Sequence, residues 1–234
     1  MQKIYVYVIQ RELMKIGVIS DIHSNKVALD AVLRDMEPVD PIVCCGDVVG
    51  YGPRPAECVA TIQEKCDYVV RGNHDRSANS PEEYRGHDMV YSGLSHTNEQ
   101  LSEEQLEWIL NLPRTCEVED YLVTHSHPDS AQLDTYVRPR MFSSMTQHLD
   151  DYDGLFLGHT HVQHAENADD RLVLNPGSVG QPRDQDKRAA YAVVDTDENS
   201  ATLHRTEYDI ELVQQQVREE NLEPRIGERL SEGR

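Results

Sequence analysis

Short apolar runs alternate with amphipathic stretches along the first half of the chain. Three runs predict short buried strands, at residues 15–19, 41–45 and 68–70. Residues 26–36 and 55–65, which lie between these runs, place apolar side chains on one helical face, and Asn25 is suited to cap the first helix. This alternation predicts β-α-β units.

The second half of the chain reads mostly as successive strands. It begins with a predicted helix at 102–111, whose capping box lets Ser102 and Gln105 satisfy each other's free backbone donors. Further strands are predicted at residues 115–124, 154–158, 163–166, 171–174, 189–195 and 201–208. With a last helix near 210–221, the pattern favours a layered α/β domain of two packed sheets with helices outside.

Length and composition favour a single domain. With 234 residues, 38% of them hydrophobic, and no apolar run of membrane-spanning length, the chain can bury one sizeable core. We expect this domain to cover residues 14–221 and residues 222–234 to be a frayed C-terminal tail. Residues 1–13 are expected to be an N-terminal extension, either an extra edge strand or a start codon assigned too early, since Met14 opens a more natural first strand.

The cysteines and the N-terminal residues favour a cytoplasmic protein. The five cysteines are odd in number and have no CxxC spacing, which argues against a disulfide framework and a zinc ribbon. The first 13 residues lack the apolar core and the cleavage site of a signal peptide. We therefore expect a reducing cytoplasm and no membrane partner, and a homo-oligomer stays open.

The net charge of -20 is the most unusual global feature, with 42 acidic and 22 basic residues. Such a surface repels nucleic acid and anionic membranes, which argues against a general DNA or RNA binder. The acidic residues are scattered, as on a solvated surface, rather than gathered in an interaction tail. Together with few Lys and only two Phe, they suit a halophilic protein kept soluble in concentrated salt.

Five apolar runs end directly in potential metal ligands. These residues are Asp21 and His23, then Asp47, then Asn73, His74 and Asp75, then His125 and His127, and finally His159 and His161. The carboxyl ends of strands in α/β sheets form ligand crevices, so we expect these side chains to meet at one sheet edge. A single Asp or His at a strand end is more often a turn former, but five such ends in series indicate a metal site.

The ordered set D-x-H, G-D, G-N-H-D, H and G-H-x-H, which spans residues 21–161, resembles the calcineurin-like metallophosphoesterases. The resemblance implies the metallo-dependent phosphatase fold, a four-layer α-β-β-α sandwich with two divalent metal ions at the sheet edge. It implies Asp21, His23 and His161 as ligands of one metal, Asn73, His125 and His159 as ligands of the other, and Asp47 as the bridge between them.

The chemistry of these residue types agrees with that assignment. Carboxylate, imidazole and amide oxygen are hard or borderline ligands, which favours Mn²⁺, with Fe, Zn²⁺ and Ni²⁺ as alternatives. Two close cations can activate a shared water for attack on phosphorus and neutralise the phosphoryl oxygens. His74 is then free to act as the catalytic general acid or to stabilise the transition state. The alternative for His74 is a strand-end histidine bonded to a neighbour.

The segment LVLNPGSVGQPRD at 172–184 is a candidate substrate loop. Asn175, Ser178 and Arg183 are candidate substrate-binding residues, because backbone N–H groups, a hydroxyl and a guanidinium suit anionic oxygens. NPGSVGQPR also resembles a stretch of small prokaryotic phosphodiesterases of this family, whereas the plain alternative is a turn between strands. His127 either contacts substrate or supports its neighbour.

One departure from the family's pattern narrows the range of substrate classes. Gly50 and Tyr51 stand where Ser/Thr protein phosphatases carry Asp and Arg, which argues against a protein phosphatase and a dinucleoside tetraphosphatase. We therefore predict a hydrolase of small or nucleotide-type phosphodiesters, with phosphomonoesters as a second substrate class. The alternative from another class is a non-catalytic binding scaffold, as in the retromer subunit of this fold, but the full ligand set counts against it.

Overall fold

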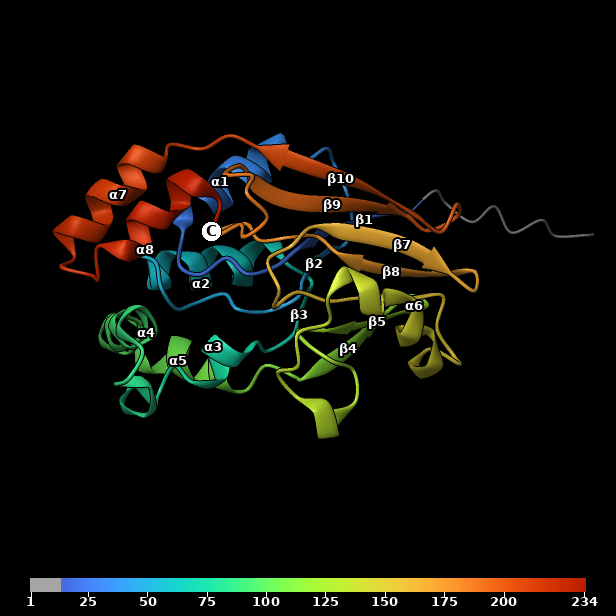
Figure 1. Cartoon of the computed structure of the whole chain (residues 1–234), viewed down its shortest axis with the longest axis horizontal. Coiled ribbons are helices and arrows are strands. Elements are labelled where there is room, and N and C mark those ends of the chain that lie inside the picture. Colours follow the sequence, from blue (N-terminus) through green and yellow to red (C-terminus); the bar gives the residue numbers. More distant parts are fainter. Residues whose placement is uncertain (1–13) are drawn as a thin grey trace, which may run out of the picture.

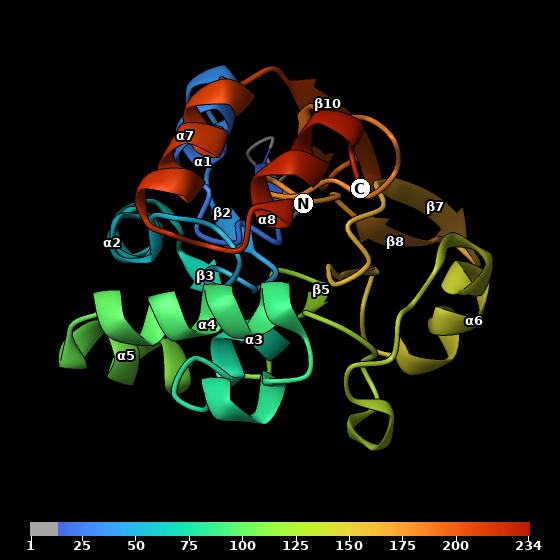
Figure 2. The ribbon, with the colours of Figure 1, turned by 60° about the vertical axis from the view of Figure 1, so that its left-hand side comes forward.

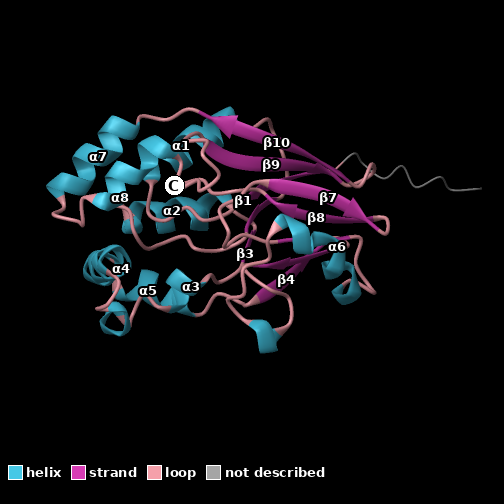
Figure 3. Cartoon of the chain, in the orientation of Figure 1, coloured by secondary structure: helices cyan, strands magenta, loops and turns pink. Residues whose placement is uncertain are grey.

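Two five-stranded sheets face each other in this chain, and helices cover their outer faces (Figures 1 and 3). The computed structural model describes residues 14–234, and the predicted extension at 1–13 lies outside the described residues. The arrangement is the predicted four-layer α-β-β-α sandwich, so the prediction of the fold class is confirmed.

The first sheet has the strand order β10-β9-β1-β2-β3. Its strands are β1 (Lys15–Ile19), β2 (Ile42–Cys44), β3 (Tyr68–Val69), β9 (Ala189–Asp195) and β10 (Ser200–Thr206). β1, β2 and β3 run parallel, and β9 and β10 extend the sheet in antiparallel pairing beyond β1. The carboxyl ends of the three parallel strands therefore lie at one edge of the sheet.

The second sheet has the strand order β4-β5-β6-β8-β7. Its strands are β4 (Thr115–Val118), β5 (Tyr121–Thr124), β6 (Gly154–Phe156), β7 (His164–Ala168) and β8 (Arg171–Asn175). β5, β6 and β8 run parallel. The prediction of one strand at 115–124 is wrong, because β4 and β5 are two antiparallel strands and Glu119, with a φ of 48°, lies in the turn between them.

The layers follow from the alternation of side chains along the strands. In β1, Ile16 and Val18 point into the core between the sheets, whereas Ile19 points into the core under the first helix layer. The helices of that layer are α1 (Lys26–Asp35), α2 (Pro55–Lys65) and α5 (Glu103–Leu110). On the far side, α6 (Phe142–Met145) packs on the second sheet.

The remaining helices surround the loops that follow β1, β2 and β3. They are α3 (Asn73–Arg76), α4 (Asp88–Gln100), α7 (Ile210–Glu219) and α8 (Arg225–Glu228). Short 3-10 helices are η1 (Pro81–Tyr84), η2 (Ser130–Gln132), η3 (Pro139–Met141), η4 (Thr146–His148) and η5 (Arg229–Glu232). In Figure 2 the red helices α7 and α8 lie opposite the green helices α3, α4 and α5.

The C-terminal residues pack against the domain, so the prediction of a frayed tail at 222–234 is wrong. Ile226 and Leu230 are buried together with Val213 and Val217 of α7 and with Tyr51. The apolar residues Ile226 and Leu230 are four positions apart, about one helical turn. The charged residues around them hid this helical pattern in the sequence.

The two helix starts that were predicted from capping residues are confirmed. Asn25 accepts a hydrogen bond from the Ala28 N–H at the start of α1, and Ser102 and Gln105 form the expected capping box of α5. Helix α4 was not predicted from the sequence. Among residues 14–234, no helix has the length and apolar character needed to cross a membrane.

Candidate metal centre

The potential ligands lie after parallel strands of both sheets. Asp21 and His23 follow β1, Asp47 follows β2, Asn73 and His74 follow β3, His125 follows β5, and His159 and His161 follow β6. Parallel strands end at the same edge of a sheet, and the two sheets face each other, so the loops converge from both sides. The structure brings these side chains together in overlapping groups that could hold metal.

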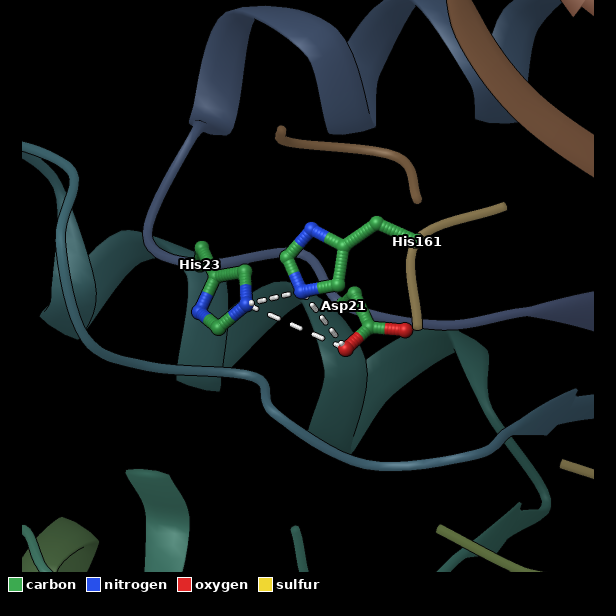
Figure 4. A group of neighbouring side chains, drawn as sticks. All are labelled: Asp21, His23 and His161. Carbon is green, nitrogen blue, oxygen red and sulfur yellow. Dashed lines mark hydrogen bonds and ion pairs between the residues drawn. The ribbon is translucent and has the colours of Figure 1, made fainter. Parts of the chain in front are cut away.

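Asp21, His23 and His161 form the first cluster (Figure 4). The Nε2 atoms of His23 and His161 are 3.1 Å apart. Oδ1 of Asp21 lies 3.2 Å from His161 Nε2 and 3.8 Å from His23 Nε2. All three side chains are buried, so their charge and lone pairs are shielded from bulk water.

Asp47, His125 and His159 form the second cluster. His125 Nε2 lies 3.3 Å from Asp47 Oδ2 and 3.2 Å from Asn73 Oδ1. A carboxylate, an amide oxygen and imidazole nitrogens thus surround one point. These ligand types suit a divalent first-row ion.

Asp47 touches both clusters through one oxygen. Its Oδ2 lies 3.3 Å from His125 Nε2 of the second cluster and 3.7 Å from His23 Nε2 of the first. Its Oδ1 accepts a hydrogen bond of 2.8 Å from the His74 backbone N–H, which orients the carboxylate. Asp47 therefore lies within reach of both clusters.

Backbone carbonyls fix which ring nitrogen of each histidine faces the clusters. The bonds join His23 Nδ1 to Val49 O, His125 Nδ1 to Cys45 O, His161 Nδ1 to Gln181 O, and His159 Nε2 to Asp134 O, over 2.6 to 3.2 Å. A carbonyl can only accept, so each of these nitrogens carries a hydrogen, and the other nitrogen offers a lone pair to the cluster whenever the ring is neutral. Lone pairs and carboxylates that converge in a buried space need a cation between them, so the residues fit a metal.

The electrostatics of the site also favour positive charge. Burial opposes ionisation of Asp47, yet the imidazoles of His125 and His74 hold its pKa well below the usual value. Burial would likewise lower the pKa of His125, but the neighbouring Asp47 carboxylate raises it to about 10. The Asp47 carboxylate is therefore ionised, and the space beside it stabilises a cation.

The ligand loops hold strained backbone. Left-handed φ values occur at five ligands: Asp21 (53°), His23 (47°), Asp47 (52°), His159 (68°) and His161 (59°). Such conformations are uncommon outside glycine and gather at functional sites, where the surrounding structure enforces them. Here the Asp21 N–H donates to Gly46 O over 2.9 Å and the His23 N–H to Asp47 O over 3.0 Å, which ties the β1 loop to the β2 loop.

His74 forms a third potential metal-binding group with His23 and Asp47, which belong to the two clusters. Its ring packs against His23 and Tyr51, with centroids 4.8 and 4.6 Å away, and Nδ1 has no hydrogen-bond partner within residues 14–234. Gly50, with a φ of 91°, makes this packing feasible, because a Cβ there would lie 2.4 Å from His74 Nδ1. Nδ1 is thus buried against Gly50, so a contact of His74 with substrate would fall to its other ring nitrogen.

The candidate substrate residues of the loop after β8 hold its shape. Asn175 Nδ2 donates to Gly158 O over 2.7 Å and to Thr160 Oγ1 over 3.0 Å. Ser178 Oγ donates to Asp21 O over 2.7 Å. Both side chains are buried and support the loops that carry ligands, and their contact with substrate stays a prediction.

The other two substrate candidates differ in position. Arg183 is half-buried, and its backbone N–H donates to His161 O over 3.2 Å, so it borders the first cluster. His127 is buried outside both clusters: its Nδ1 accepts from the Asp129 N–H over 3.1 Å and its ring contacts His148. Both roles considered for His127 in the sequence stay predictions.

Three residues at the site have structural roles that the sequence did not predict. Asp75, which the sequence gave as a potential metal ligand, is buried and accepts from the N–H groups of Val49 and Gly72, which joins the loops after β2 and β3. Its place in the G-N-H-D block was the available signal. Tyr51 packs on His23 and His74, and the loop carbonyl of Asp134 orients His159. No sequence pattern marks Asp134.

Comparison with known proteins agrees with this geometry. Residues 14–199 match the calcineurin-like phosphoesterase superfamily domain. An uncharacterized protein of Methanocaldococcus jannaschii is 32% identical over 242 residues, which cover 94% of this chain and 98% of that protein. A phosphodiesterase of the same organism is 26% identical over 168 residues, which cover 70% of this chain and 83% of that protein.

Solved structures share the fold. A metallophosphoesterase from Sphaerobacter thermophilus superimposes with a TM-score of 0.82 and 34% identity, covering 95% of this chain and 100% of that one. A hypothetical protein from Pyrococcus horikoshii gives a TM-score of 0.83 at 20% identity, over 95% and 99% of the two chains. The chain therefore belongs to the calcineurin-like phosphoesterase superfamily and is a metal-dependent phosphoric ester hydrolase.

Proposed function

We propose that this protein hydrolyses phosphodiesters of a small or nucleotide-type substrate at a dinuclear metal centre, with phosphomonoesters as a second substrate class. The observation that carries the proposal is the position of Asp47, whose Oδ2 faces His23 of one cluster and His125 of the other. Two cations so close need a shared counter-charge, and Asp47 supplies it.

The residues divide between two ions in this proposal. Asp21, His23 and His161 hold one ion, whereas Asn73, His125 and His159 hold the other, with Asp47 shared. Mn²⁺ is our first choice, with Fe, Zn²⁺ and Ni²⁺ as alternatives, because the donors are hard or borderline. None of the clusters contains a thiol that would favour a softer ion.

The chain's own residues orient the substrate and stabilise the charge that develops on it. When bound, the metal ions supply Lewis acidity that withdraws charge from the phosphoryl oxygens and lowers the pKa of a water. Burial lowers the pKa of His74 to about 4, so its ring is neutral at pH 7. A neutral imidazole donates a hydrogen bond from one nitrogen, which favours stabilisation of the leaving oxygen over transfer of a proton from an imidazolium.

The diester preference rests on the relative and on the loop after β2. The Methanocaldococcus jannaschii relative that covers 70% of this chain is called a phosphodiesterase. Gly50 and Tyr51 replace the Asp and Arg expected of a protein phosphatase or a dinucleoside tetraphosphatase, which keeps these two functions as weaker alternatives. The complete ligand set counts against a non-catalytic scaffold.

A substrate and metal panel tests the proposal. Chelator-treated protein is assayed with bis(p-nitrophenyl) phosphate, p-nitrophenyl phosphate and a phosphopeptide, each with Mn²⁺, Ni²⁺, Zn²⁺ or Mg²⁺. We expect turnover of the diester to exceed that of the monoester and the phosphopeptide, and bound metal to approach two ions per chain. Faster turnover of the phosphopeptide, or full activity with one bound ion, would refute the proposal.

A further inference from the structure

Asp134, in the loop between η2 and η3, makes two backbone contacts to segments that carry ligands of the second cluster. Its carbonyl oxygen accepts a hydrogen bond of 2.9 Å from His159 Nε2, which leaves His159 Nδ1 to face a cation. Its N–H donates to Ser126 Oγ over 3.1 Å, and Ser126 directly follows His125. The backbone of Asp134 thus connects the start of the loop after β5 with the loop after β6.

The carboxylate of Asp134 connects to the loop after β3. Both terminal nitrogens of Arg76 bind it: Nη2 donates to Oδ2 over 2.5 Å and Nη1 to Oδ1 over 3.3 Å. Arg76 ends helix α3, which begins at the candidate ligand Asn73 and carries His74. The Arg76 N–H donates to Gly72 O over 3.1 Å, so this single helical turn fixes Arg76 relative to Asn73.

Asp134 has a backbone conformation that needs such contacts. Its φ of 64° lies in the left-handed region, which is uncommon for residues other than glycine. Residues of this kind persist where the surrounding structure fixes them, and they gather at functional sites. The N–H, the carbonyl oxygen and the carboxylate of Asp134 are each bound by a different partner. Because five candidate ligands are also left-handed, the strain extends from the ligand loops to Asp134.

The ion pair between Arg76 and Asp134 is suited to orientation rather than to stability. The two side chains are 36% and 38% exposed, and ion pairs this exposed add little to the free energy of unfolding. Two parallel hydrogen bonds, in contrast, fix the direction of both groups. Arg76, Asp134, His125 and Ser126 line one small cavity, so the pair borders the second cluster directly.

We propose that Arg76 and Asp134 are positioning residues for the ion of the second cluster. Together they hold the loops of Asn73, His125 and His159 at the separation that this ion requires. The inference rests on the proposed function, because it needs a second cluster that holds its own ion. Without the ion pair every ligand remains, but the Asp134 carbonyl is free to move away from His159, and the ion binds less tightly.

Metal titration of two variants tests this role. Arg76→Gln removes the cation, whereas Asp134→Asn removes the carboxylate but keeps the carbonyl and suits a left-handed φ. Equilibrium dialysis of chelator-treated protein against Co²⁺ gives two dissociation constants, and the visible spectrum of bound Co²⁺ reports on ligand geometry. We expect each variant to raise one dissociation constant roughly tenfold, to leave the other within about twofold, and to change the spectrum. The double variant should lose no more than either single variant, because both remove the same contact.

Three comparisons separate positioning from a general loss of stability. Arg76→Lys keeps the charge but not the paired geometry, so it should recover part of the affinity. The melting temperature of the metal-free protein should be the same in the parent and the variants, as expected for an exposed ion pair. Arg225→Gln is the matched control, because Arg225 pairs with Glu223 and Asp88 on the surface, and it should leave both constants unchanged.

The outcomes distinguish this role from the proposed function. Unchanged constants in both Arg76→Gln and Asp134→Asn, or equal losses at both ions, would overturn the positioning role. Turnover of bis(p-nitrophenyl) phosphate by the parent reports separately on the proposed function. A parent that binds two ions but does not hydrolyse this diester refutes the phosphodiesterase alone, and the positioning role then stands on the metal affinities of the variants.

Discussion

Among single residues, Asp47 has the most demanding position. It is 1% exposed, it faces both ligand clusters, and its carboxylate also accepts the His74 N–H. We predict that Asp47→Ala abolishes turnover and reduces bound metal, because two close cations lose their shared counter-charge. Metal analysis and diester assays check this. Asp30→Ala on helix α1 is the control, and near-parent activity of Asp47→Ala with two ions bound would contradict the prediction.

We propose that His74 contacts substrate rather than metal. We predict that His74→Ala keeps the parent metal content but loses roughly 10² to 10⁴ in kcat, the range of one electrostatic or acid–base group. The loss should be smaller for nitrophenyl esters than for alkyl esters, since nitrophenolate needs little stabilisation. Equal losses on both would argue against contact with the leaving oxygen.

The protonation of His125 predicts how many protons are released when metal binds. Its pKa is raised to about 10, so it carries a proton at pH 7, whereas the pKa values of His23, His159 and His161 are lowered and these rings are neutral. A metal ligand must be unprotonated, so binding should release about one proton per chain, and metal affinity should rise as pH increases from 6 to 8. Indicator-dye titration with Mn²⁺ measures the release. No release at pH 7 would contradict this assignment.

Among the elements, the C-terminal segment contributes more than its sequence indicates. Leu230 of η5 is 3% exposed in the cluster formed with α7 and Tyr51. We predict that Leu230→Ala lowers the free energy of unfolding by about 2 to 5 kcal/mol, because it leaves a cavity in a packed core. Leu212→Ala on α7 is the matched control, since Leu212 is 39% exposed and should change stability by less than about 0.5 kcal/mol. Denaturant unfolding checks both variants, and similar small losses would mean that the segment is loosely attached.

For the whole molecule, the net charge of -20 predicts a response to salt. The Debye length is about 30 Å at 0.01 M and about 3 Å at 1 M, so molar KCl should relieve repulsion among surface carboxylates and raise the melting temperature. Salt also strengthens apolar burial, so the comparison needs a variant with about ten surface Asp or Glu changed to Asn or Gln. That variant should be more stable than the parent in low salt and respond less steeply to KCl. Parallel melting curves would remove the argument for a halophilic protein.

The sequence by itself determined the features that depend on residues close together in the chain, such as the periodicity of apolar residues and the caps of helices. Strand β1 and helix α1 were predictable because apolar periodicity and the Asn25 cap act within a few residues. The convergence of the potential ligands was predictable because they follow apolar runs, and strand ends in such folds meet at one edge. The selection of seven among them came from the resemblance to the calcineurin-like metallophosphoesterases.

Tertiary structure decided what depends on contacts between distant segments. Leu230 lies beside Tyr51 only because the C-terminal segment packs against the domain, and the carbonyl of Asp134 orients His159 across 25 residues of chain. The hairpin at 115–124 and the packing of Leu230 likewise depend on which surfaces are available to bury. Apolar spacing shows that a side chain seeks burial, but the partner that buries it is chosen by the assembled fold.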